Sequence, residues 1–218
     1  MSGDSPTLVS GDSPTVVSED GAAGIPTVLI EGCAAAQAAL LDDLVDLSDE
    51  VARQPSRLPG WSVGHLLTHV ARNGDSMSWR LEGAALGELR DQYPGGLEQR
   101  SRDIEEGAGR PAVELVDDVR RSGEALERIM ADLPAAAWDA PSRTSRGVVE
   151  TSRDAALSRW REVVVHHADL GFGPVPLPPA LVEVWLPREL PRLAERSDPA
   201  ALLSWIIGRG EPPVLAPW

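Results

Sequence analysis

A helix-forming region in the second half of the chain reads Arg159-Trp-Arg-Glu-Val-Val-Val-His-His-Ala-Asp-Leu-Gly171. Four prolines follow within eight residues of Gly171, and glycine followed by proline is typical of the end of a helix. We therefore predict a helix over about 151–170. Residues four apart lie on the same face of a helix, so Glu162 and His166 project in the same direction.

The sequence before and after this helix also favours helices. Apolar residues recur at steps of three and four, and capping residues or prolines mark the ends. Three more long helices are predicted over about 28–47, 62–83 and 111–132, with a short one at 98–106 and two C-terminal pieces at 180–195 and 199–207. No segment shows a convincing alternating strand pattern. The sequence thus predicts an all-α protein built around a four-helix bundle.

The chain divides into three parts. Residues 1–24 contain a tandem octapeptide, in which Ser2–Val9 is nearly repeated as Ser10–Val17. This small, polar, proline-containing stretch has too few apolar groups to offset ordering entropy, so we expect a disordered tail. Residues 25–172 would form the bundle. Residues 173–218 would be a short C-terminal segment that packs on it.

The charge and composition exclude some functions. The chain of 218 residues has a formal net charge of −14 and no lysine, which argues against a general nucleic-acid or anionic-membrane surface. No apolar run is long enough to span a bilayer, and the N-terminus lacks a secretory signal, so a cytoplasmic protein is expected. The single cysteine, Cys33, lies in an apolar helical stretch and is expected to be a buried, unreactive thiol.

The four histidines lie in two of the predicted helices, as His65 and His69 in one and His166 and His167 in the other. One histidine from the first helix could join Glu162 and His166 inside the bundle, which is how bundles build metal sites. A set of two histidines and one carboxylate leaves a coordination position open, as catalytic Zn²⁺ sites do. Spacing alone does not choose between His65 and His69. It also allows ordinary hydrogen-bonded histidines without a metal.

Four segments together resemble one known family, the mycothiol-dependent maleylpyruvate isomerases, whose metal-binding part has the DinB-like helical fold. Besides the Arg159–Gly171 stretch they are Pro55-Ser-Arg-Leu-Pro-Gly-Trp-Ser-Val-Gly-His-Leu-Leu-Thr-His-Val-Ala-Arg-Asn73, Tyr93-Pro-Gly-Gly-Leu-Glu-Gln-Arg-Ser-Arg-Asp-Ile104 and Leu202-Leu-Ser-Trp-Ile-Ile-Gly-Arg-Gly210. The resemblance covers nearly all of the chain after the tail. Relatives have a small α/β module at the C-terminus, whereas the region after Gly171 looks shortened here.

The resemblance implies which residues form the site. The metal would be Zn²⁺, and the ligands would be His69, Glu162 and His166. Residues thought to help bind the thiol or the substrate are Arg100, Arg209, Asn73 and Asp169. Arginine suits a substrate with two carboxylates because its guanidinium binds a carboxylate in a bidentate manner.

The activity implied is a zinc- and mycothiol-dependent isomerisation of maleylpyruvate to fumarylpyruvate by thiolate addition, bond rotation and elimination of the thiol. The partners would be a small-molecule thiol and an anionic or electrophilic substrate, with neither nucleic acid nor membrane. The protein would be a monomer or a small homo-oligomer. A mycothiol S-transferase acting on another electrophile is the first alternative, and a non-catalytic metal-binding module is the second.

Overall fold

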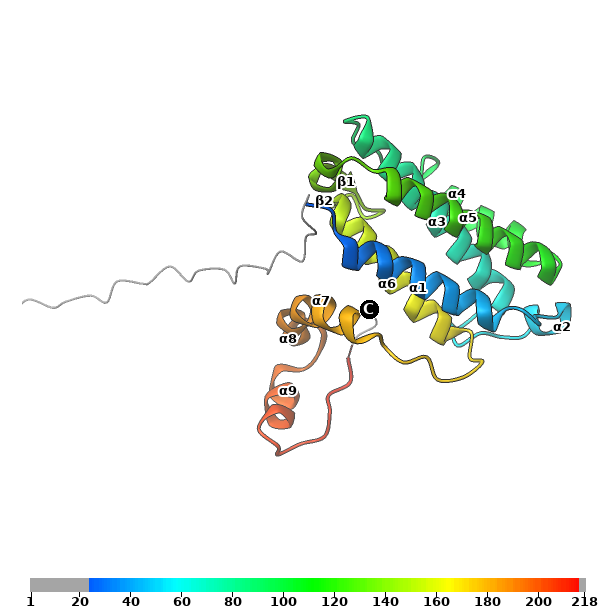
Figure 1. The fold of residues 1–218 in the computed structure, drawn as a ribbon. Helices are drawn as coiled ribbons and strands as arrows, with labels where there is room; N and C mark the ends of the chain where they lie inside the picture. Colours follow the sequence, from blue (N-terminus) through cyan, green and yellow to red (C-terminus); the bar gives the residue numbers. More distant parts are fainter. Residues whose placement is uncertain (1–23, 216–218) are drawn as a thin grey trace, which may run out of the picture.

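The structure is a computed structural model, and it describes residues 24–215 (Figure 1). Four long helices form the body: α1 (Thr27–Asp43), α3 (Val63–Ala85), α5 (Ala112–Asp132) and α6 (Ser152–Asp169). Shorter helices are α2 (Asp49–Ala52), α4 (Gly96–Ala108), α7 (Pro179–Glu189), α8 (Leu193–Arg196) and α9 (Pro199–Ile206), with 3-10 turns η1 (Ala135–Asp139) and η2 (Leu190–Arg192). The prediction of an all-α fold is confirmed.

The long helices pack lengthwise around one apolar core (Figure 1). Helix α3 contacts α4, α5 and α6, and α1 lies against α5 and α6. Burying the apolar stripes of these helices is the main source of stability in such a bundle. The largest fully buried side chains include Leu40, Leu66, Leu67, Leu115, Trp138 and Leu157.

Local capping fixes where α3 and α6 begin. Ser62 accepts a hydrogen bond from the backbone N–H of His65, and Thr151 accepts one from that of Asp154. In both helices the third residue also returns a side-chain bond to the cap, which satisfies two backbone donors. Helix α6 ends before Gly171, whose φ of +81° favours glycine. These ends set the register of the two helices that face each other across the core.

A small hairpin precedes α6, where no strand was predicted. Strand β1 (Pro141–Arg143) pairs antiparallel with β2 (Val149–Thr151). Strands of three residues are too short to show an alternating pattern, which explains why the sequence missed them. Buried Arg80 of α3 anchors the hairpin, because its guanidinium donates to Ser142 Oγ and to a Glu150 carboxylate oxygen, both over 2.6 Å.

The other differences from prediction concern helix ends. Helix α1 stops at Asp43 rather than near residue 47, and α4 is longer than the predicted 98–106 helix. The first C-terminal piece is divided into α7, η2 and α8, with Pro187 inside α7 and Pro191 in the 3-10 turn. Except for Gly24, the predicted tail lies outside the described residues. None of the helices in residues 24–215 is both long and apolar enough to span a bilayer.

The C-terminal segment contacts the bundle through α7. This helix packs on α1 and α6 and buries Leu181 completely. Helix α9 packs on α8 and stands apart from α3 and α4 in Figure 1. Its Leu203 and Trp205 are exposed. The division of the chain at residues 24 and 172 stays a prediction.

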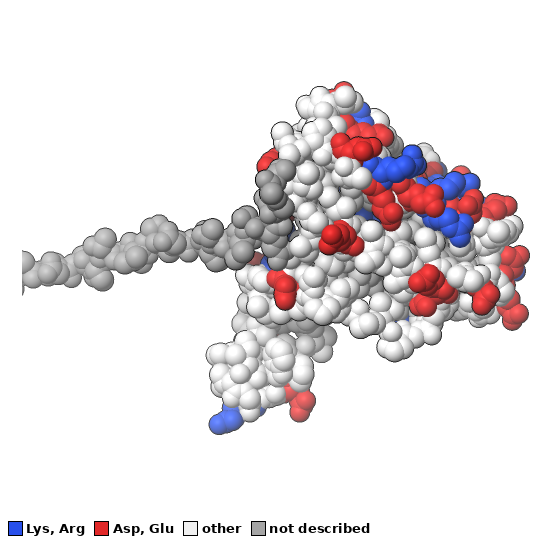
Figure 2. Space-filling view, viewed as in Figure 1, with Lys and Arg blue, Asp and Glu red and all other residues white. Residues whose placement is uncertain are grey.

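Acidic side chains are spread over the face of the bundle shown in Figure 2. The few arginines on this face lie mostly among carboxylates over α5. Arg121 and Asp117 form one such pair within that helix, with 2.7 Å between the charged atoms. Carboxylates on this face thus offset part of the arginine charge over α5.

Candidate metal centre

Three side chains from two helices converge inside the bundle. His69 comes from α3, and Glu162 and His166 come from successive turns of α6. The Nε2 atom of His69 lies 3.1 Å from Nε2 of His166 and 3.2 Å from Oε2 of Glu162. The Glu162 oxygen is also 3.2 Å from Nε2 of His166. The three atoms therefore form a nearly equilateral triangle.

This triangle fits a divalent metal ion. A tetrahedral Zn²⁺ with bonds of about 2.0–2.1 Å holds its ligand atoms about 3.3 Å apart, close to the observed spacing. Two imidazole nitrogens and one carboxylate oxygen are also a donor set that Zn²⁺ accepts, with a fourth position left open. His69 is only 4% exposed, while the side chains of His166 and Glu162 are 13% and 22% exposed. The cluster is therefore more exposed at Glu162 and His166, on α6, than at His69 on α3.

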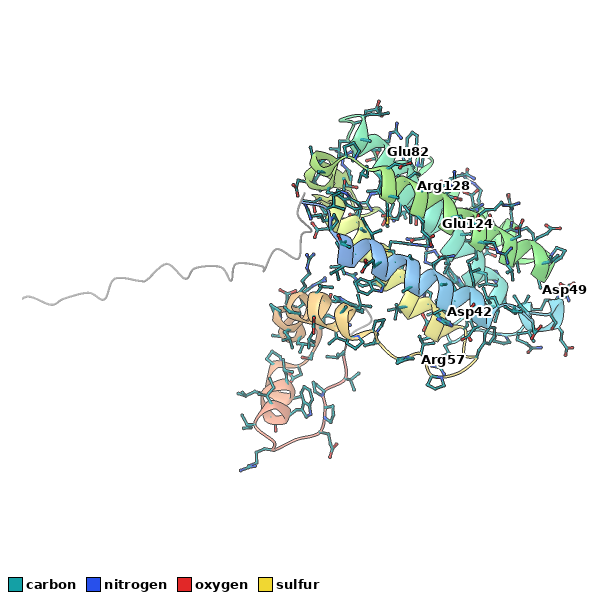
Figure 3. All side chains as sticks on the ribbon, in the orientation of Figure 1. Asp42, Asp49, Arg57, Glu82, Glu124 and Arg128 are labelled. Atoms are coloured by element: carbon teal, nitrogen blue, oxygen red, sulfur yellow. The ribbon has the colours of Figure 1, made fainter. Side chains whose placement is uncertain are left out.

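Asp169 orients His166. Its Oδ2 atom lies 3.0 Å from Nδ1 of His166, one turn further along α6. A carboxylate bound to the far nitrogen of a histidine fixes the ring and leaves Nε2 free to act as a ligand. The backbone of Asp169 is held as well, because its carbonyl accepts from the N–H of Arg57 over 2.8 Å. Figure 3 labels Arg57 at this C-terminal end of α6.

The far side of His69 has a different environment. Its Nδ1 atom lies 3.0 Å from a guanidinium nitrogen of Arg100, which is carried by α4. The ring of Trp61 meets the His69 ring edge-on, with 5.5 Å between centroids. Arg100 also lies over the ring of Tyr93, 5.8 Å from its centroid. Arg100 and the Trp61 ring thus contact His69 directly, and Tyr93 lies beyond Arg100.

The three side chains of this cluster have unequal proton affinities. Burial lowers the pKa of His69, and Glu162 only partly offsets this effect. Burial also opposes the charge of His166, but Glu162 and Asp169 outweigh it and raise the pKa of His166. Despite its burial, hydrogen bonds from both histidines hold the pKa of Glu162 far below its ordinary value. The cluster thus keeps an ionised carboxylate between two imidazoles, which suits a cation.

The structure separates the two candidates that spacing could not separate. His65 serves as a capping residue, with Nδ1 2.7 Å from Ser62 Oγ, and its Nε2 faces Glu105 at 3.4 Å. His167 points to α1, where its Nε2 lies 2.8 Å from Asp43. Only His69 joins Glu162 and His166 among the described residues.

Asn73 lies beside a buried arginine rather than at the His69–Glu162–His166 cluster. Its Oδ1 accepts from Arg159 over 2.8 Å, and Arg159 also donates to the carbonyl of Val70 and to Gln37 Oε1. Asn73 is 3% exposed, and its side chain binds Arg159 instead of facing the thiol and substrate as expected. No sequence pattern predicted that Arg159 and Gln37 are buried, because arginine and glutamine are mostly exposed in proteins.

Arg209 does not lie at the His69–Glu162–His166 cluster. It follows α9, is exposed, and donates to the carbonyl of the adjacent Gly208 over 3.2 Å. Helix α9 itself lies apart from α3 and α4 (Figure 1). Of the four residues expected to contact thiol or substrate, Arg100 and Asp169 therefore lie next to a histidine of the cluster, whereas Asn73 and Arg209 have other surroundings.

Comparison with known proteins places this arrangement in a family. Residues 33–171 match the family model described as the mycothiol maleylpyruvate isomerase N-terminal domain. Two solved structures have a similar fold: the crystal structure of mycothiol-dependent maleylpyruvate isomerase and that of its histidine-to-alanine mutant. Each has a TM-score of 0.65 and 23% identity, and the match covers 71% of this chain and 65% of the solved chain. This chain thus spans slightly less than two thirds of those relatives. No curated protein sequence matches it.

Proposed function

The chain belongs to the family of the mycothiol maleylpyruvate isomerase N-terminal domain, and from this membership we propose that it is a metal- and thiol-dependent cis–trans isomerase of the maleylpyruvate type. The observation that carries the proposal is the triangle of His69, Glu162 and His166, whose edges are 3.1–3.2 Å. A family match by itself describes ancestry. The intact ligand set supports the chemistry, because function depends on the site rather than on the fold.

The residues of the cluster have separate roles in this proposal. His69, Glu162 and His166 would hold Zn²⁺, and Asp169 would keep the His166 ring in its ligating orientation. Bound there, Zn²⁺ would supply the positive charge that keeps a mycothiol sulfur deprotonated at neutral pH, where a free thiol is mostly protonated. The chain's own cysteine does not replace the external thiol, because Cys33 is buried against the carbonyl of Ala156.

Arg100 is the residue best placed to receive a substrate carboxylate. Its guanidinium lies 3.0 Å from Nδ1 of His69, a proposed metal ligand. Within residues 24–215 no carboxylate forms an ion pair with this guanidinium. A bidentate bond from arginine would orient an unsaturated dicarboxylic acid beside the activated sulfur. For Arg209 to bind substrate, the C-terminal segment would have to move. For Asn73 to bind substrate, its contact with Arg159 would have to break.

A mycothiol S-transferase is the second candidate, and one observation favours it. The substrate of an isomerase of this type carries two carboxylates, but Arg209, the other arginine expected to bind one, is exposed beyond α9. About a third of the solved relatives also lies outside the match to this chain. A site with the same metal and thiol but a single nearby arginine would accept an electrophile with less negative charge.

The two functions are separated by one assay on metal-quantified protein. Maleylpyruvate is supplied with and without mycothiol, and fumarylpyruvate formation is followed. Thiol-dependent formation without consumption of the thiol supports the isomerase. Stoichiometric zinc without isomerisation, together with thiol conjugation to members of an electrophile panel, favours the transferase. Protein with neither bound metal nor activity contradicts both.

A further inference from the structure

A cavity lies on the face of α6 that points away from the candidate metal centre. It is bounded by α1, by α6 and by the segment that connects α6 to α7, and its volume is about 500 Å³. From α6 it is lined by Trp160, Val164 and His167, which are four and three residues apart. Glu162 and His166 project from the opposite side of the same helix. The cavity is therefore separate from the candidate metal centre.

Small residues on α1 create this space. Four residues at steps of three, one and three along one face of α1 line the cavity, and none has a side chain beyond Cβ. They are Gly32, Ala35, Ala36 and Ala39. At Gly32 a Cβ atom would lie only 2.4 Å from the Trp160 ring, so a larger residue would not let this ring lie so close to α1. The α1 wall thus leaves a gap that its own side chains do not fill.

The roof of the cavity is residues 174–179, which read Pro-Val-Pro-Leu-Pro-Pro. The proline ring fixes the backbone φ angle and removes the N–H donor, so a segment of this composition is a semi-rigid spacer. A stiff roof needs little ordering when a ligand binds, which favours binding. The volume also lies within the range of small-molecule sites, about 300–1,000 Å³.

The charged groups of the cavity favour a cation. Asp42 and Asp43 line its end on α1, and both residues are exposed (Figure 3 labels Asp42). Asp43 contacts Nε2 of His167 over 2.8 Å, whereas Asp42 has no ion pair within residues 24–215. No arginine is among the described residues that line the cavity. Complementary charge in a ligand is therefore positive at this end.

A hydrogen-bond donor without a partner lies toward the other end. The indole N–H of Trp160 is buried and has no hydrogen-bond partner among the described residues. It is bonded to Cε2, the ring atom nearest to the Cβ position at Gly32, so the N–H lies on the α1 side of the ring. A buried donor that stays unpaired costs free energy, which an acceptor on a ligand would recover. Gly32 and Asp42 are about 15 Å apart along α1 at 1.5 Å per residue.

We propose that this cavity is a second ligand site, which takes an elongated apolar small molecule with a protonated amine at one end and a hydrogen-bond acceptor toward the other. The ammonium lies at Asp42, the apolar chain lies along the alanines of α1 and Val164, and the acceptor lies near Trp160. This inference does not rest on the proposed function. The ligand is opposite in charge to the anionic substrate proposed for the metal centre, so the two sites select different molecules.

The first test compares two ligands with the same body. N-(5-aminopentyl)benzamide has an amide carbonyl at one end and an ammonium at the other, and 6-benzamidohexanoate has a carboxylate in place of the ammonium. Nitrogen-15 NMR follows the indole N–H of Trp160, assigned through correlations within its own side chain. We expect the amine to shift this signal and to bind with a Kd of about 1 mM or tighter, as a ligand of this size can. The carboxylate should bind at least about tenfold more weakly, because exposed carboxylates attract the one and repel the other.

The second test locates the site with two pairs of matched variants. Ala38 and Ala39 are both exposed on α1, but of the two only Ala39 lines the cavity. Ala39→Phe fills the space and should weaken amine binding at least about tenfold, whereas Ala38→Phe should change it less than about twofold. Asp42→Asn should reduce the preference for the amine about threefold, and Asp46→Asn, at an exposed residue outside the lining, should leave it unchanged.

The outcomes bear on separate parts of the inference. Absence of any shift at Trp160, or equal binding in Ala39→Phe and Ala38→Phe, would overturn the site. Equal affinity for the amine and the carboxylate, or an unchanged preference in Asp42→Asn, would overturn the assigned ligand class. Zinc binding should be the same with and without saturating amine, because the cavity and the metal centre lie on opposite faces of α6. Protein that binds the amine but takes up no zinc would contradict the proposed function and leave this site in place.

Discussion

The Nδ1 atom of His166 lies 3.0 Å from Asp169, while the neighbouring His167 points the other way and places its Nε2 2.8 Å from Asp43. Two consecutive histidines on one helix thus each have a carboxylate partner, but of the two only His166 belongs to the candidate metal cluster. This difference offers a matched comparison between a carboxylate that contacts a proposed metal ligand and one that contacts a histidine outside the cluster.

We predict that Asp169→Asn weakens zinc binding about 10–100-fold, because the ring of His166 loses its orienting carboxylate. Asp43→Asn alters the same kind of bond at a histidine that is not a ligand, so it should leave the affinity unchanged. Competition with a chromophoric chelator measures both affinities. Equal losses in the two variants would show that Asp169 has no special role at the metal.

Cys33 should be unreactive in the folded protein. Burial raises the pKa of its thiol to about 12, and the side chain is 5% exposed. A thiol with such a pKa supplies almost no thiolate at pH 8, and thiolate is the reactive form. A disulfide reagent should label the single cysteine only after denaturant is added. Rapid labelling of the native protein would contradict this account and reopen Cys33 as a nucleophile.

Asp154 gives a pH-dependent contribution to stability. Partial burial opposes its charge, but hydrogen bonds from Arg188 and Thr151 outweigh it and hold the pKa of Asp154 below its ordinary 3.8. A carboxyl group with a lowered pKa in the folded state stabilises the protein above its unfolded pKa and loses this effect as the pH falls below it. Asp154→Ala should therefore cost about 1 kcal/mol at pH 7, as loss of a cap does, and progressively less below about pH 4.

Urea unfolding at several pH values measures this change. Asp139→Ala serves as the control, because Asp139 also pairs with an arginine but its side chain is 71% exposed. That variant should shift the free energy of unfolding by less than about 0.5 kcal/mol. A cost for Asp154→Ala that stays constant from pH 7 to pH 3.5 would contradict the assigned role of the ionised carboxylate.

The sequence was most informative where periodicity and capping act together. The start of α3 after Ser62 and the end of α6 before Gly171 follow from local rules, and the structure confirms both. The hairpin before α6 was not predicted, because each of its strands has only three residues. The lengths of α1 and α4 depended on tertiary contacts, which local propensity does not report.

For the site, the sequence was limited by what spacing can show. His65 and His69 share a helix face, yet a signal that separates them was present: a serine three residues before His65 marks it as a capping residue. The placement of Arg100 against Nδ1 of His69 had no such signal, because it depends on how α4 packs on α3. The burial of Arg159 also could not be predicted from the sequence, since its side-chain partners come from two other helices.

The most direct test of the central claim is the metal content of purified protein and of five single variants after dialysis, with circular dichroism as a check on helicity. We predict one zinc per chain in the wild type and in His65→Ala and His167→Ala, whose side chains lie outside the cluster. His69→Ala, Glu162→Ala and His166→Ala should keep most of their helicity and lose the metal. Stoichiometric zinc in the His69→Ala variant would contradict the assignment of the site.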